Sequence, residues 1–226
     1  MSQKCKDLIK TIVAMVVFWL IGVIGSEVLA FLLMQSGLEE EKLILFYKWG
    51  SMLVTLVIAF PCFVGVTRKL GMEECYLVKE QYKLSIKSHA LRLALSLLPA
   101  IIMFAIIIVF DRKGINSSAN MIQWKRELLL GDILLGCFLM PITEEIMFRG
   151  ILLKNLQIYG KGFATIISTL CFVIGHGNLV NMLLAIVPGV IFANTANKTE
   201  GLKYGMLYHM IVNFAGKIVI PMILVL

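Results

Sequence analysis

Charged residues are scarce in this chain. Asp, Glu, Lys and Arg make up 15% of the 226 residues, whereas 59% are hydrophobic and the mean hydropathy is +0.90. A soluble globular domain carries about 25% charged and about 45–50% apolar residues. The composition therefore excludes a chain built mainly of soluble domains and indicates a polytopic membrane protein.

Paired cysteines and the common protease motifs are also missing. No cysteine belongs to a CxxC pair and three lie in apolar runs, so we expect free thiols and neither a disulfide framework nor a zinc ribbon. The sequence has no HExxH, which excludes the usual helical zinc-protease arrangement, and no GxSG or GxGD motif of serine or aspartyl intramembrane proteases. The cysteines are Cys5, Cys62, Cys75, Cys137 and Cys171.

Long apolar runs are what the chain does contain. A membrane-spanning helix needs about 20 mostly apolar residues, and seven stretches meet or approach that length. Alternation typical of a barrel is absent, so we predict an all-α bundle of seven to eight transmembrane helices. Residues 1–226 form one integral membrane domain, in which 1–127 hold the first three spans and 128–226 a catalytic core. The expected spans are 9–34, 43–66, 91–110, 128–153, 162–175, 179–196 and 205–226.

The net charge of +7 is better explained by membrane topology than by binding to nucleic acid. The basic residues lie in short connections between apolar runs, where they orient the spans and meet anionic lipid. With the N-terminus inside, the inner connections hold twelve Lys and Arg residues and the outer ones five. We therefore expect a cytoplasmic N-terminus and an external C-terminus, although the connection 111–127 carries charges of both signs.

Two adjacent acids interrupt the fourth apolar run. An ionised carboxylate in hydrocarbon costs at least a few kcal/mol, so Glu144 and Glu145 are candidates for function. Arg149 follows Glu145 by four residues on the same helical face and can neutralise it. Glu144 has no such partner within one turn. The spacing thus predicts one structural acid and one working acid.

Two of the three histidines also lie in apolar runs. His176 follows Phe172 by four residues, and His209 precedes Asn213 by four, so each histidine shares a helical face with one partner. His89 lies in a charged connection and is expected to be a solvated surface histidine. Lys217 is expected to snorkel or to face protein.

Counting from the turn at 159–162 brings two of these residues together. Glu144 and His176 each lie sixteen residues from Gly160, so an antiparallel pair of helices places them level, about 24 Å from the turn. His209 and Asn213 lie closer to their own turn. They can lie level with Glu144 and His176 only if the helices protrude unequally from the bilayer.

Such a set of side chains suits peptide hydrolysis. Glu144 can act as general base on a water that His176 shares, and His176 can later pass a proton to the leaving amine. His209 and Asn213 can donate hydrogen bonds to the oxyanion. Alternatively, Glu144, His176 and His209 can hold zinc with a bound water. A non-catalytic membrane scaffold or immunity protein is the third interpretation.

Three motifs, in order on successive hydrophobic helices, resemble the CPBP family, the CAAX-protease and bacteriocin-processing group that is also called Abi. They are Glu144-Glu145-x-x-x-Arg149, Phe172-x-x-x-His176 and His209-x-x-x-Asn213. The similarity covers about residues 139–214, roughly a third of the chain.

The resemblance implies an intramembrane glutamate-type endopeptidase that uses no metal or other cofactor. It assigns Glu144 and His176 to water activation and His209 with Asn213 to the oxyanion. Family members cleave prenylated CAAX proteins in eukaryotes, and in bacteria they process or resist bacteriocin- and pheromone-type peptides. The short chain resembles a bacterial member of the cell membrane, acting on a peptide or protein at the bilayer.

Overall fold

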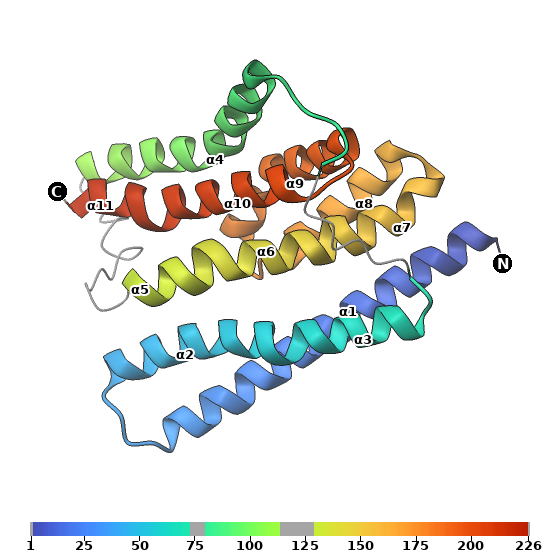
Figure 1. Cartoon of the computed structure of the whole chain (residues 1–226). Helices are drawn as coiled ribbons and strands as arrows, with labels where there is room; N and C mark the ends of the chain where they lie inside the picture. Colours follow the sequence, from blue (N-terminus) through green and yellow to red (C-terminus); the bar gives the residue numbers. More distant parts are fainter. Residues whose placement is uncertain (1, 73–79, 114–128, 226) are drawn as a thin grey trace.

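The molecule is a bundle of helices. The computed structural model describes residues 2–72, 80–113 and 129–225, and these residues contain no strand (Figure 1). They form seven continuous helical stretches, which confirms the predicted all-α bundle. Cys75 and most of the connection 111–127 lie outside the described residues.

The seven stretches are divided as follows. The first three are α1 (Gln3–Met34), α2–η1–α3 (Glu40–Val54, Thr55–Ala59, Phe60–Lys69) and α4 (Ile86–Arg112). The fourth is α5–η3–α6–η4–α7–η5 (Leu129–Gly131, Asp132–Leu139, Met140–Glu145, Ile146–Leu153, Lys154–Leu156, Gln157–Tyr159). The last three are α8 (Lys161–Ile174), α9 (Leu179–Thr199) and α10–η6–α11 (Lys203–Phe214, Ala215–Val219, Ile220–Val225).

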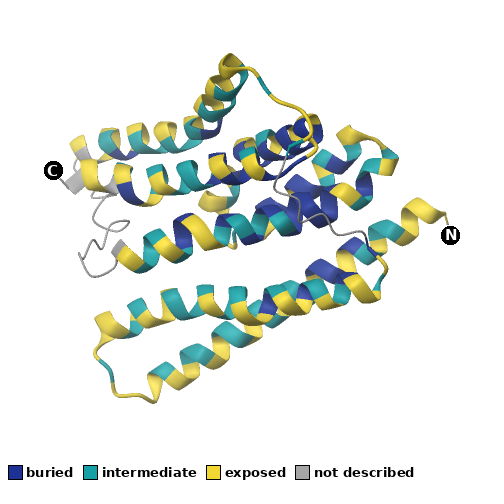
Figure 2. Ribbon diagram, in the orientation of Figure 1, coloured by how far each residue is buried: buried dark blue, intermediate teal, exposed yellow. Residues whose placement is uncertain are grey.

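Among the described residues, four helices are long and apolar enough to cross a membrane: Gln3–Met34, Glu40–Lys69, Ile86–Phe110 and Leu179–Thr199. In Figure 1 the hairpin of α1 with α2 and α3 forms one side, and the stretch from α5 to α7 lies between it and α10. Figure 2 shows buried residues gathered around α6, α7 and α9, whereas much of α1, α2 and α4 is exposed. Apolar side chains on these exposed faces suit contact with lipid, as expected of an integral membrane protein.

Helix α8 is too short to cross the bilayer. Its 14 residues span about 21 Å, less than the hydrocarbon core of about 30 Å. The helix ends at Ile174, and a turn follows it. His176 belongs to this turn and not to a helix, which corrects the expectation from the sequence.

Prolines widen two of the helices. The π-helical segments η1 and η3 each run directly into an α-helix with a proline in its first turn, Pro61 and Pro141. Proline has no N–H to donate, and its ring clashes with the carbonyl one turn earlier. In η3 the N–H of Met140 donates to the carbonyl of Leu135, five residues back. The carbonyl of Gly136 therefore has neither Met140 nor Pro141 as a donor and is open to side chains of another helix.

The first helix is fastened to the turn before α8. The hydroxyl of Tyr159 donates to Oδ2 of Asp7 at 2.5 Å. Burial, together with this hydrogen bond, raises the pKa of Tyr159 to about 12, so the hydroxyl keeps its proton at neutral pH. The bond therefore holds the start of α1 against η5.

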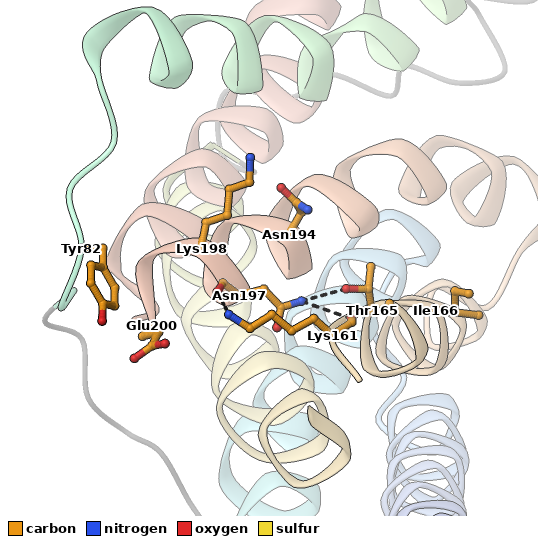
Figure 3. A pocket seen from close by; sticks show the side chains of 9 residues that line it. Tyr82, Lys161, Thr165, Ile166, Asn194, Asn197, Lys198 and Glu200 are labelled. Atoms are coloured by element: carbon orange, nitrogen blue, oxygen red, sulfur yellow. Dashed lines mark hydrogen bonds between the residues drawn. The ribbon is translucent and has the colours of Figure 1, made fainter. Parts of the chain in front are cut away.

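Helices α8 and α9 are joined at the same end of the bundle by Asn197. Its Nδ2 donates to Oγ1 of Thr165 at 2.8 Å (Figure 3). Its Oδ1 accepts from Nε2 of Gln157 at 2.7 Å. Nζ of Lys161 donates to the Asn197 backbone carbonyl at 3.1 Å. A polar cavity of about 760 Å³ opens beside this joint, and none of the predicted catalytic residues lines it.

Replacing Asn197 with alanine is expected to loosen this joint. The substitution Asn197→Ala removes three side-chain hydrogen bonds, so we expect a loss of about 1–3 kcal/mol in stability. Thermal unfolding of the purified protein measures it. The control is Lys198→Ala, which changes an exposed neighbouring residue and should leave the midpoint of thermal unfolding unchanged. Equal unfolding midpoints for the two variants would contradict the claim that Asn197 stabilises the contact between α8 and α9.

Candidate active site

The two adjacent acids point in different directions. Glu145 is 0% exposed, and its Oε1 lies 2.8 Å from Nη1 of Arg149, the ion pair expected from the spacing. Nη2 of Arg149 donates to the backbone carbonyl of Gly189 on α9 at 3.0 Å. The guanidinium carbon lies 4.3 Å from the centre of the Phe172 ring. Arg149 thus joins the motif helix to α8 and α9.

His209 lies between the two acids. Its Nδ1 is 3.1 Å from Oε1 of Glu145, and its Nε2 is 3.5 Å from Oε2 of Glu144. The ring stacks on Phe192 at 5.0 Å between centres. A carboxylate only accepts hydrogen bonds, so Nδ1 carries a proton toward Glu145, and Nε2 is the nitrogen that faces Glu144.

Close packing makes this contact possible. Gly205 on α10 lies against Glu145: a Cβ added there would be 3.0 Å from Oε2 of that glutamate. Any larger residue would push the acid away from its partners. The pairing of His209 with both acids was not predicted from the sequence, because it depends on how closely α10 approaches α6.

Glu144 faces open space, with 21% of its side chain exposed. It lines two cavities. The first, here the core cavity, has a volume of about 270 Å³ and lies among α4, α9 and α10. The second, the hairpin chamber, has about 890 Å³ and lies between the α1–α2 hairpin and the core. His176 and Phe172 line both cavities, so the two meet at Glu144 and His176.

His176 is held in the turn by its own helix end. Its Nδ1 lies 2.8 Å from the backbone carbonyl of Phe172, and the two rings pack edge to face at 4.6 Å. A carbonyl cannot donate, so Nδ1 carries the proton and a neutral ring keeps Nε2 as an acceptor. Gly177, with φ +75°, lets the chain turn, and Asn178 caps α9 through the N–H of Asn181 at 2.9 Å.

Asn213 is anchored by the open carbonyl in η3. Its Nδ2 donates to the Gly136 carbonyl at 3.0 Å, and it lines the core cavity. One of its two N–H bonds is thereby used, and the other remains for a ligand. All four predicted catalytic residues, Glu144, His176, His209 and Asn213, therefore line the same cavity.

The alternative zinc site would need its ligands to converge on one point. Zinc needs ligand atoms of three protein side chains at about 2.0–2.2 Å from the ion. Within the described ranges, no three His, Cys, Asp or Glu side chains are grouped in that way. Both ring nitrogens of His209 face carboxylates, and Nδ1 of His176 is bound to Phe172.

His89 is not a solvated surface residue, which corrects the expectation. It belongs to α4, its Nδ1 is hydrogen-bonded to the hydroxyl of Tyr208, and its ring packs on Tyr204 at 4.3 Å. These contacts fasten α4 to α10 next to His209. Only the tertiary structure shows this role, because the two helices are over one hundred residues apart.

A comparison with known families bears on this site. Residues 126–215 match a family model described as Rce1-like, "Type II CAAX prenyl endopeptidase Rce1-like". The comparisons with curated proteins and with solved structures gave no match. The matched segment is less than half of the 226 residues and contains all three motifs. It confirms the resemblance: over residues 126–215 this integral membrane chain is similar to the Rce1-like proteases of the CPBP family.

Proposed function

We propose that the protein is an intramembrane endopeptidase that uses a glutamate-activated water and no metal. The observation that carries this proposal is the shared cavity of Glu144, His176, His209 and Asn213. A carboxylate, two imidazoles and a carboxamide around one space supply a base, a proton carrier and oxyanion donors.

Glu144 and His176 activate the water. The water lies between the Glu144 carboxylate and Nε2 of His176, and Glu144 takes its proton as the oxygen attacks the scissile carbonyl carbon. A C–O bond forms, and the carbonyl electron pair moves onto oxygen. The proton then passes from Glu144 through Nε2 of His176 to the leaving nitrogen as the C–N bond breaks, which restores the carboxylate and the neutral ring.

His209 and Asn213 stabilise the oxyanion. Asn213 donates through its second side-chain N–H, since the first is bonded to the Gly136 carbonyl. His209 donates through Nε2 when its ring is protonated, and the Glu145 carboxylate, 3.1 Å from Nδ1, holds the ring in place. Removing one donor of this kind costs about 10²–10³ in kcat in a well-studied protease.

The substrate class follows from the family and from the hairpin chamber. The family model is described as a CAAX prenyl endopeptidase, and a chamber of about 890 Å³ beside lipid-facing helices has room for a lipid-modified peptide. We propose a membrane-associated peptide or protein of CAAX-like or bacteriocin- and pheromone-type, in a cell membrane with the N-terminus cytoplasmic. Nucleic acid has no part in this function.

Removing the base or the proton carrier should abolish cleavage. We expect Glu144→Gln and His176→Ala each to lower kcat by about 10²–10⁴, because general acid–base groups contribute that much. Cleavage of a prenylated CAAX peptide in proteoliposomes measures it. Glu200→Gln, an exposed glutamate that does not line the core cavity, should keep full activity. Full activity in either site variant would contradict the assignment of Glu144 and His176 to water activation. If cells that carry the double variant keep the biological phenotype, the non-catalytic scaffold is favoured.

Metal removal separates the two hydrolytic mechanisms. Dialysis against a strong chelator should leave the cleavage rate unchanged, because Glu144 and His176 activate the water themselves. An inactivation that zinc reverses would instead favour the metal-dependent alternative.

A further inference from the structure

Lys217 brings a positive charge to the wall of the core cavity. It lies in η6, two helical turns after His209, and its Nζ donates to the Gly136 carbonyl at 3.4 Å, a long hydrogen bond. No carboxylate of a described residue forms an ion pair with it. Asp132, one turn before Gly136, is already paired with Lys48 at 2.7 Å. The Lys217 side chain is exposed at this wall, so its ammonium group is accessible to an anionic ligand in the cavity.

The distance from the reacting groups to Lys217 corresponds to a few residues of peptide. Eight residues of helix separate it from His209, a rise of about 12 Å. An extended peptide covers about 3.3–3.6 Å per residue. The Lys217 side chain reaches back toward the site, because its Nζ shares the Gly136 oxygen with Nδ2 of Asn213, at 3.4 and 3.0 Å. A carboxylate bound at Lys217 therefore lies no more than about three residues from a scissile carbonyl held at Asn213.

The rest of the cavity wall is small and mostly apolar. Ala100 comes from α4, Ala185 and Pro188 from α9, and Val212 from α10. The volume of about 270 Å³ is just below the usual range for ligand pockets, about 300–1,000 Å³. It suits a short aliphatic segment that ends in a negative charge. The larger hairpin chamber is left for the rest of the substrate.

We infer that Lys217 binds the free C-terminal carboxylate of the substrate and so determines where the chain is cut. The core cavity holds the short leaving peptide, and the hairpin chamber holds the retained part with its new C-terminus. This inference rests on the proposed endopeptidase function. It adds the residue that distinguishes a C-terminal tail from an internal segment of another protein.

A pair of substrates that differ only in terminal charge tests this role. The full-length protein in proteoliposomes is given one prenylated peptide ending in Cys-aliphatic-aliphatic-X, either as the free acid or as the C-terminal amide. A hydrogen bond to a charged group is worth about 1.5–3 kcal/mol. We therefore expect wild-type kcat/KM to favour the acid by about tenfold to a hundredfold, mainly through KM, with release of the terminal tripeptide.

The variants separate charge from structure. Lys217→Met should cleave acid and amide alike, at the wild-type rate for the amide, which also shows that the variant is folded. Lys217→Arg should keep the preference for the acid. Lys203→Met is the matched control, since it removes an exposed cation from the same helical stretch outside the core cavity.

Two results would overturn the inference, and they differ. A wild-type enzyme that cleaves acid and amide equally, or a Lys217→Met variant that keeps the preference, contradicts the role of Lys217 and leaves the endopeptidase intact. A wild-type protein that cleaves neither peptide contradicts the proposed function on this substrate class, and the inference with it.

Discussion

The buried ion pair between Glu145 and Arg149 is the interaction on which the site depends. Its 2.8 Å contact lies among Phe172, Phe192 and the backbone of Gly189, away from water. Loss of one partner from such a pair typically costs 3–5 kcal/mol, because the other charge is left buried. The pair is completed by Nδ1 of His209, so the same carboxylate that neutralises Arg149 also fixes the ring that faces Glu144. One acid is thereby used for structure, and its neighbour is free for chemistry.

A second constraint comes from Pro141, one turn before the acids. Because neither Met140 nor Pro141 donates to it, the Gly136 carbonyl accepts hydrogen bonds from Asn213 and Lys217 on the last helical stretch. Both side chains are thus held at the core cavity by a backbone feature of the opposite helix. The proposed oxyanion donor and the inferred carboxylate-binding residue share one anchor.

Local spacing predicted much of this arrangement. The four-residue interval anticipated the Glu145–Arg149 pair, and counting from Gly160 brought Glu144 and His176 to the same cavity. The contact of His209 with both acids, and the role of His89, arise from the packing of α10 on α6 and α4. That packing depends on Gly205 and on residues far away in sequence, so no periodicity within one helix indicates it. The end of α8 was predicted to within one residue, but His176 was expected on a helical face with Phe172 and lies instead in the turn that follows.

The central claim is that Glu145 supports the site while Glu144 performs the chemistry. Thermal unfolding and cleavage measured together on Glu144→Gln and Glu145→Gln test it most directly. Glu144→Gln should unfold at the wild-type temperature and cleave no substrate, whereas Glu145→Gln should unfold at a clearly lower temperature, because Arg149 keeps a buried charge without its partner. The reverse result, an unstable Glu144 variant beside a stable Glu145 variant, would contradict the account.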